Sequence, residues 1–328
     1  MKMLHRIKQF FLAHEPMRHP RWELIIMRVV LALLAWDMHS NWTASYKDPV
    51  QAVQLMVTNA QHVDVMESSQ PKPNGLGLLV DFSFLSNDRI EKPLRALTAT
   101  SLLLYIVGVP SVISLAIPMF FCLGVATLKN SQGFIGHTAQ VLHLALLSVW
   151  LAGAWGWWRA RQGKPLPWDF TQGQFEADIT RQSIAAGYVV SGITKLVFSQ
   201  GTWFSSAKYL PLHIVKNTEM KYLDAVNPTA LKHDWLPQLM MEHPLLCQLL
   251  FGAALPLELF AFVGLYNRRS AALFGIALIA FHESVTQLMS LSFIFNKALL
   301  LVFFVAPWWW LFGRKPTSLP TIPLASQA

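Results

Sequence analysis

Eight ionisable side chains lie within or at the edges of long apolar stretches of this sequence. A charged group in hydrocarbon is costly, so each of these residues is a functional hypothesis. It competes with a structural ion pair and with a side chain that reaches back to the membrane surface. The eight are Arg28, His137, His143, Lys195, Glu258, His282, Glu283 and Lys297.

Lys195 has the clearest chemical context. Helical spacing places Tyr188, Ser191 and Lys195 on one polar stripe of a predicted helix. Near the outer end of that helix, partial desolvation favours the neutral amine of a lysine, which can accept a proton. We therefore predict that Lys195 is a catalytic base, with Tyr188 and Ser191 binding substrate beside it. A lysine that only reaches to the membrane surface is the alternative.

Two histidines come from other predicted helices. His137 begins one of them, and a step of three residues to Gln140 starts a polar ridge on it. In a later helix, His282-Glu283 begins like a zinc-protease motif, but Thr286 stands where the second histidine is required. We predict His137 and His282 as catalytic, Gln140 and Glu283 as substrate-binding, and no metal site. A metal held by His, His and Glu from separate helices is the alternative.

Three other charged residues are interpreted as structural. Arg28 and Glu258 carry opposite charges on different predicted helices, where they would support a buried polar patch by pairing or capping. Lys297 lies between two apolar runs, so its long stem is expected to carry the amine to the membrane surface.

Eight predicted membrane-spanning helices must position these residues. Each apolar run was compared with the roughly 20 residues that cross the hydrocarbon. The sequence Gly108-Val109-Pro110-Ser111 predicts a hairpin rather than one long helix, because proline ends a helix. The predicted fold is an all-α, polytopic integral membrane bundle. Its spans lie near 23–36, 96–109, 111–127, 138–158, 182–199, 244–265, 270–292 and 295–312.

The distribution of basic residues predicts the topology. Residues 1–22 form a basic, interfacial N-terminal arm, residues 23–312 the transmembrane domain, and residues 313–328 a cytoplasmic tail. With the arm cytoplasmic, eight crossings leave both termini cytoplasmic, as the positive-inside rule expects. The long connections 39–93 and 201–243 then fold over the outer mouth. The inner basic residues are Arg159, Arg161, Lys164, Arg268, Arg269, Arg314 and Lys315.

This topology brings four candidate residues to the outer half of the membrane. His137, Lys195, His282 and Glu283 come from three separate predicted helices. Because independent segments converge there, the sequence favours a catalytic or ligand-binding pocket over scattered structural polar groups.

Composition excludes several other classes of protein. The chain is 53% hydrophobic and only 13% charged, which does not fit a soluble domain. Its net charge of +8 is spread over short segments between apolar runs, so no nucleic-acid partner is predicted. Cys122 and Cys247 lie apart from one another, which indicates neither a disulfide framework nor a thiolate metal site.

Three segments carry a likeness to a known family. They are the tract YVVSGITKLVFSQGTWFSSAKYL with Tyr188, Lys195, Trp203 and Tyr209, the pair Gly136-His137, and the set Glu258, Leu265 to Arg269 and Phe281-His282. Together they resemble the membrane domain of vitamin K-dependent gamma-carboxylase and its bacterial relatives, the horizontally transferred transmembrane (HTTM) proteins. The likeness covers roughly residues 20–312.

The resemblance implies that Lys195 deprotonates reduced vitamin K, menaquinol or a related quinol. Oxygen would then form an alkoxide that removes a weakly acidic carbon-bound proton, with His137 and His282 positioning or polarising that chemistry and Trp203 binding substrate. Gly136 departs from the family's usual Asn. The large extra-membrane domain with which the carboxylase grips its protein substrates has no counterpart here, so protein carboxylation is not expected.

The predicted function is a bacterial inner-membrane enzyme in which a lysine base acts on a quinol or other lipid-soluble substrate near the outer face. The alternative is a non-catalytic protein that binds quinone or lipid or scaffolds a partner, with polar residues that only shape a pocket. A transporter ranks third. Two halves of similar hydropathy with corresponding broken spans would indicate one, and this sequence lacks them.

Overall fold

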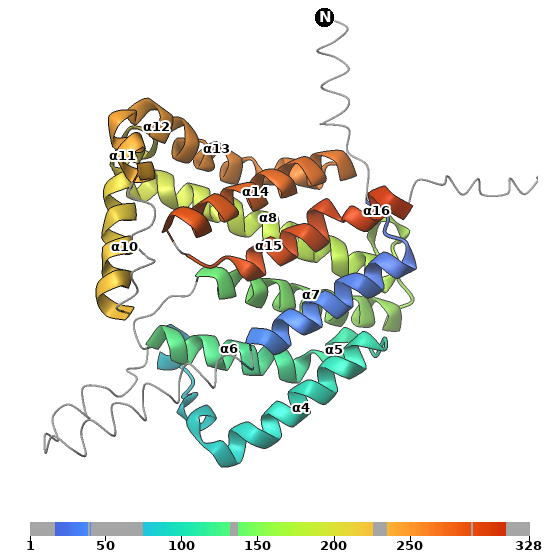
Figure 1. The fold of residues 1–328 in the computed structure, drawn as a ribbon. Helices are drawn as coiled ribbons and strands as arrows, with labels where there is room; N and C mark the ends of the chain where they lie inside the picture. The colour runs from blue at the N-terminus through green and yellow to red at the C-terminus, as the bar shows by residue number, and fades with distance from the viewer. Residues whose placement is uncertain are drawn as a thin grey trace, which may run out of the picture.

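The computed structural model describes residues 17–38, 40, 75–131, 137–225, 235–289 and 291–312. All regular structure in these ranges is helical, and none of it is strand. Figure 1 shows a bundle of long helices with a smaller group of helices, α10 to α12, across one end. The all-α prediction is therefore confirmed for the described part of the chain.

The helices follow one another along the chain in three groups. The bundle begins with residues 21–38 and continues with α4 (Asp88–Ile106), α5 (Ser111–Ser114), α6 (Ala116–Ser131), α7 (His137–Arg161) and α8 (Gln172–Phe198). The end group is α9 (Trp203–Ser206), α10 (Leu210–Ala225), α11 (Trp235–Glu242) and α12 (Pro244–Gly252). The chain re-enters the bundle with α13 (Ala254–Leu259), η6 (Ala261–Leu265), α14 (Arg268–Met289), α15 (Ile294–Leu300), η7 (Leu301–Val305) and α16 (Pro307–Phe312).

Three helices in the described residues are long and apolar enough to cross a membrane, by their length and composition. They are Ala139–Arg161, Arg268–Met289 and the composite helix Ile294–Phe312. Each coincides with one of the eight predicted spans, and together they indicate a membrane protein. The other five predicted crossings remain a proposal, because the helices there are shorter, less apolar or more charged.

The predicted hairpin at Gly108-Val109-Pro110-Ser111 is confirmed. Helix α4 ends at Ile106, and Gly108 adopts a φ of 102°, which favours glycine. Pro110 precedes the first residue of α5, where its missing N–H costs no helical hydrogen bond. The Ser114 hydroxyl donates to the carbonyl of Pro110 and holds the turn. The chain therefore reverses here and packs α4 against α5 and α6.

Helix α8 begins ten residues earlier than the predicted span at 182. Its first turn is a capping box in which the Thr171 hydroxyl accepts from the backbone N–H of Gln174, and the Gln174 side chain accepts from the Thr171 N–H. This cap adds residues 172–181 to the helix. The result is a 27-residue rod that reaches from one end of the bundle to the other (Figure 1).

The predicted spans that precede and follow α14 are not regular helices. The predicted span 244–265 divides into α12, α13 and η6. The predicted span 295–312 contains a π turn, η7, and Ala306 follows it in a left-handed conformation with a φ of 44°. Each interruption changes the direction in which side chains project from the chain.

A glycine allows α13 to lie unusually close to α8. A Cβ added to Gly192 would stand 2.9 Å from Cγ of Leu259 and 3.1 Å from its backbone nitrogen. Real Cβ atoms rarely approach a neighbour so closely, so only glycine permits this contact. Because Leu259 follows Glu258, the close approach brings that carboxylate next to α8.

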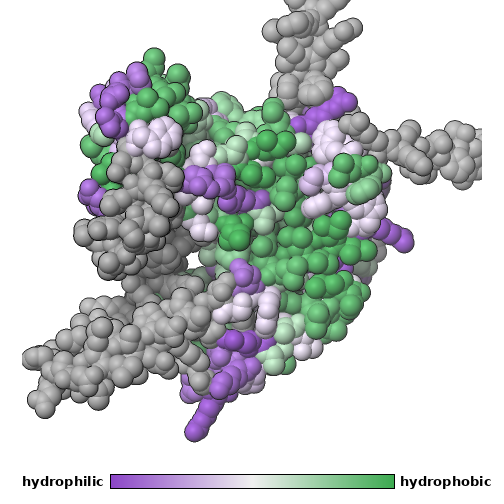
Figure 2. Space-filling model, viewed as in Figure 1, coloured by the Kyte–Doolittle hydropathy of each residue, from purple (hydrophilic) through white to green (hydrophobic). Residues whose placement is uncertain are grey.

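The core lies between α7 and α8, and much of the outer surface is apolar. Leu142, Leu146 and Ile184 are fully buried where these two helices pack. Figure 2 shows hydrophobic residues over much of the visible face of the bundle. A continuous apolar surface of this kind fits contact with lipid. Exposed examples are Leu33, Leu103, Leu151, Val197 and Ile276.

Candidate functional site

Lys195 forms a partly buried ion pair with Glu258. The Lys195 Nζ donates to Oε2 of Glu258, and Ser191 Oγ donates to the same oxygen at 3.3 Å. Nζ also lies 3.4 Å from Ser191 Oγ. The side chain of Glu258 is 4% exposed, whereas that of Lys195 is 22% exposed. The carboxylate is thus enclosed, and the amine keeps one open side.

The polar stripe predicted on α8 has the expected geometry. Ser191 and Lys195 are one helical turn apart and converge on one carboxylate, while Tyr188 projects from the preceding turn towards α14. Glu258 comes from α13, which the glycine contact at position 192 holds against α8.

Trp203 lies beside the amine. Its ring centroid is 5.4 Å from the Lys195 Nζ, within the range of a cation–π interaction. Trp203 opens α9, the first helix after the end of α8. Trp203 thus lies next to the Lys195 amine, and its role in binding substrate stays a prediction.

His282 belongs to a second hydrogen-bonded group nearby. The Tyr188 hydroxyl lies 2.7 Å from Nε2 of His282, and Asn296 Nδ2 donates to the same hydroxyl at 3.4 Å. All three residues are buried, with exposed fractions of 4%, 4% and 5%. Tyr188 lies one helical turn before Ser191 on α8, which ties this group to the Lys195 pair. Asn296 was missed in the sequence because a single neutral amide at the start of a predicted span attracts no attention.

Two phenylalanines pack around the imidazole. The ring of Phe293 is stacked on His282, with centroids 4.5 Å apart and planes 27° apart. Phe281 lies 5.5 Å away in a tilted arrangement. These contacts fix the ring plane, so the direction of its two nitrogen atoms is set by the fold.

Glu283 does not join the site, which corrects its predicted role as a substrate-binding residue. Its side chain is 48% exposed, accepts from Lys297 Nζ at 2.6 Å and accepts from Gln287 at 2.7 Å. Adjacent helical residues project about 100° apart, so His282 faces the core and Glu283 faces outward. The Lys297 amine, expected at the membrane surface, is held by this ion pair.

Two residues at the start of α7 were predicted to belong to the site, and the structure describes no contact between either of them and Lys195 or His282. Gln140 is exposed and has no described contact with Lys195 or His282. His137 is the first residue of α7, and its side chain lies outside the described part of the structure. The prediction of a catalytic His137 is therefore untested.

Arg28 and Glu258 do not pair with one another. The Arg28 Nη2 lies 3.6 Å from Oε2 of Glu176, a residue of α8 that the sequence prediction overlooked. Oε1 of Glu176 accepts from Ser111 at 2.6 Å and from Gln172 at 3.0 Å. Arg28 therefore pairs with a carboxylate on another helix, but that carboxylate is Glu176 and not Glu258. A cavity of about 10 Å³, which matches roughly one water molecule, lies beside this pair.

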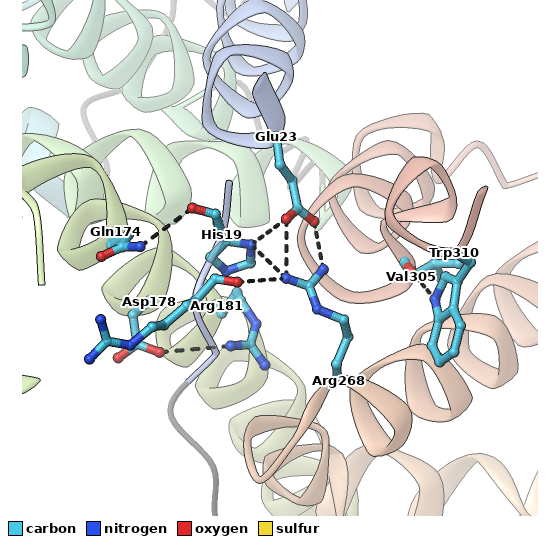
Figure 3. Close-up of polar contacts among 9 residues, drawn as sticks. His19, Glu23, Gln174, Asp178, Arg181, Arg268, Val305 and Trp310 are labelled. Atoms are coloured by element: carbon cyan, nitrogen blue, oxygen red, sulfur yellow. Dashed lines mark hydrogen bonds and ion pairs between the residues drawn. The ribbon is translucent and has the colours of Figure 1, made fainter. Parts of the chain in front are cut away.

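A larger charged cluster lies at the other end of α8 (Figure 3). Nη1 and Nη2 of Arg268 donate to the two carboxylate oxygens of Glu23, at 2.7 and 3.1 Å. Nη2 also donates to the carbonyl of Arg18 at 3.0 Å. Nδ1 of His19 lies 3.1 Å from the Glu23 carboxylate. Because these residues precede or begin a predicted span, counting apolar runs did not single them out.

Arg181 completes this cluster and is fully buried. After the membrane sides predicted from the sequence, we call this group the inner cluster and the Lys195–Glu258 pair the outer site. Its Nη2 donates to the carbonyl of Gly264 at 3.0 Å, and its Nη1 lies 3.7 Å from the Asp178 carboxylate. Burial lowers the pKa of His19, and Arg181 and Arg268 lower it further, while Glu23 acts in the opposite direction. The cluster therefore joins the segment before the first helix to α8, η6 and α14.

Within the described residues, no group of three or more His, Cys, Asp and Glu side chains is placed to hold a metal ion. The arrangement around Lys195 offers proton-transfer and hydrogen-bonding groups.

Protein-family models, curated proteins and solved structures give no match to this chain.

Proposed function

We propose that this chain is a membrane-embedded enzyme in which the Lys195 amine is a general base for a lipid-soluble substrate. One observation carries the proposal: the partly exposed Lys195 amine is paired with the enclosed carboxylate of Glu258. An ionisable pair inside a membrane protein is a functional-site hypothesis by default. Three further polar side chains, from α8, α14 and α15, lie close to it.

The pair provides a way to make the amine basic. A general base must be neutral when it acts, and Oε2 of Glu258, which already accepts a hydrogen bond from Nζ, is the group to which the amine can pass its proton. The result is a neutral amine next to a carboxylic acid. The free amine then accepts a proton from the substrate on its exposed side, and Glu258 remains beside the resulting ammonium.

We propose a quinol as the substrate class, following the resemblance to the HTTM family and the vitamin K-dependent gamma-carboxylase membrane domain. The residues fit such a group: the Trp203 ring beside the amine would pack on a planar ring, and Lys195 would meet an acidic hydroxyl. His282, between Phe281 and Phe293, would hydrogen-bond a substrate oxygen.

We also propose eight crossings with both termini cytoplasmic, in a bacterial inner membrane. The described helices support this path. Arg159 and Arg161 at the end of α7 and Arg268 at the start of α14 are basic, as expected at a cytoplasmic boundary. Lys195 lies in the last turn of α8 and therefore at the opposite end of the bundle.

The test is oxygen-dependent epoxide formation from reduced menaquinone and reduced phylloquinone, with purified protein in nanodiscs. Lys195→Met should lower turnover by about 100-fold or more, the usual scale of a lost general base. Lys297→Met is the matched control, because it removes the same cation from another lysine–glutamate pair. Equal turnover in wild type and Lys195→Met would refute the assigned base.

The alternative is a non-catalytic protein that binds quinone or lipid. The Lys195–Glu258 pair favours it in one respect, because Glu258 and Ser191 already engage the amine, as in a structural ion pair. Under this alternative, the wild-type protein in nanodiscs retains the quinone but forms no epoxide. Lys195→Met then lowers the melting temperature, and there is no turnover for it to change.

A further inference from the structure

The hydrogen bonds around Tyr188 determine where its proton lies. Asn296 Nδ2 can only donate, so the Tyr188 oxygen is the acceptor in that bond. The single hydroxyl proton of Tyr188 is then directed to its other neighbour, Nε2 of His282, at 2.7 Å. Nε2 must therefore accept.

A neutral imidazole whose Nε2 accepts carries its proton on Nδ1. His282 makes no contact with a carboxylate among the described residues, and a buried imidazolium without a partner would be costly. The ring is thus neutral and has an Nδ1–H donor. The stacked Phe293 ring fixes the plane in which this donor lies.

Two polar atoms of this group are buried and have no hydrogen-bond partner among the residues that the structure describes. They are Nδ1 of His282 and Oδ1 of Asn296, on side chains that are 96% and 95% buried by their exposed fractions of 4% and 5%. One is a donor and the other an acceptor. Buried atoms of this kind are normally satisfied, so a pair of opposite character in one group calls for an explanation.

We infer that Tyr188 and Asn296 are positioning residues that hold His282 as its Nδ1–H tautomer, and that this N–H and Asn296 Oδ1 together bind a hydroxyl group of a lipid-soluble ligand. A hydroxyl accepts from His282 with its oxygen and donates its proton to Asn296. An ether or a carbonyl could satisfy only the donor. The aromatic rings of Phe281 and Phe293 fit a phenolic ligand.

This inference names the ligand class for the site proposed around Lys195, and it depends on the proposed function only for the view that the ligand is a substrate. The tautomer and the hydroxyl preference are properties of the protein without turnover. They can therefore be measured independently of epoxide formation.

The first measurement is nitrogen-15 NMR of histidine-labelled protein in nanodiscs, with the His282 signals assigned by His282→Gln among the 11 histidines. Wild type should show a protonated Nδ1 and an unprotonated Nε2. Tyr188→Phe removes one oxygen and should give a mixture of tautomers. The matched control Tyr209→Phe, at an exposed tyrosine, should leave the His282 signals unchanged. A protonated Nε2 in wild type would overturn the inference.

The second measurement titrates phenol and anisole against the His282 Nδ1 signal. Phenol should bind about tenfold more tightly than anisole, because only phenol can also donate to Asn296. Asn296→Leu should reduce this ratio to about one while the protein stays folded, as judged by its melting temperature. Equal affinity for both compounds in wild type would overturn the hydroxyl site. Phenol selectivity without epoxide formation would leave this inference standing and remove the proposed quinol chemistry.

Discussion

Two charged groups on α8, the cluster around Arg181 and the Lys195–Glu258 pair, differ in how completely protein partners enclose them. Arg181 and Lys195 are 14 positions apart, or about 21 Å along the helix axis. At the inner end, Arg181 and Glu23 are fully buried. Arg268 binds the Glu23 carboxylate with two nitrogen atoms. At the outer end, one carboxylate and one hydroxyl engage Lys195, whose side chain remains 22% exposed.

This contrast separates a structural network from a site where chemistry can occur. A closed cluster holds elements together but gives a substrate no access to its charges. A pair with one open side can exchange a proton with a molecule that approaches from the lipid. The following variants test that distinction by disturbing each cluster in turn.

The largest effect is expected for Arg268→Met in the inner cluster. Among the described residues, the change leaves His19 alone as a side-chain partner of the buried Glu23 carboxylate, and breaking a buried ion pair typically costs about 3–5 kcal/mol. Thermal unfolding in detergent measures the loss. Lys164→Met, at an exposed basic residue, is the control. A small effect, equal to that of the control, would mean that the inner cluster does not hold the fold together.

Gly192→Ala should disturb the outer site through the backbone. The new Cβ would push α13 away from α8, at a cost of about 1–3 kcal/mol, and would draw Glu258 from Lys195. Gly187→Ala is matched, because there the Cβ meets only Leu144 Cδ2 at 3.6 Å. That variant should be as stable as wild type or slightly more stable. Melting temperature and turnover should fall only in Gly192→Ala; parallel behaviour of both variants contradicts the close-approach argument.

Glu258→Gln tests the outer pair itself. Loss of the enclosed carboxylate should cost about 1–2 kcal/mol, less than for the inner cluster, because the partly exposed Lys195 amine can still be solvated. Turnover should fall together with stability. Glu283→Gln removes the same charge from an exposed pair and should change neither quantity measurably. Equal losses in these two variants would show that burial of Glu258 does not matter.

The smallest effect is a pH dependence of the inner cluster. Burial holds the pKa of His19 below its ordinary value of 6.5. Just below that pH the His19 imidazole therefore stays neutral in the folded protein, whereas in the unfolded chain it takes up a proton. The unfolded state then binds more protons, and stability should decrease as the pH falls below about 6.5. Melting temperatures measured across this range should decline less steeply for His19→Gln. An identical slope in both proteins would assign the pH dependence to other groups.

Helical periodicity was enough to predict the outer stripe, and for a physical reason. Residues within one helix have fixed relative directions, so Ser191 and Lys195 had to share a face. The partner of Lys195 depends on how α13 crosses α8, which the glycine at 192 permits but no local pattern specifies. The same limit explains why Arg28 binds Glu176 rather than Glu258.

The inner cluster was missed because hydropathy marks only the apolar part of a helix. The predicted span started at residue 182, yet α8 begins at Gln172 with Arg181 and Glu176 inside it. Thr171 and Gln174, three residues apart, are the sequence signal of a capping box and would have extended the helix. Glu283 shows a different limit: its neighbour His282 faces the core, and the apolar run that contains both residues does not indicate that Glu283 faces outward.

The π turn at Leu301–Val305 implies that the spacing between α15 and α16 depends on one residue. Such a turn takes in one residue more than an α turn, as if a single amino acid had been inserted into a regular helix. The wider turn absorbs that residue, whereas a further inserted residue that no second wide turn absorbs would rotate everything beyond it by about 100°. Trp309, which lies 4.5 Å from the Arg268 guanidinium, would then turn away from it. Tolerance of further insertions in this short stretch should therefore be far lower than its uniformly apolar sequence implies.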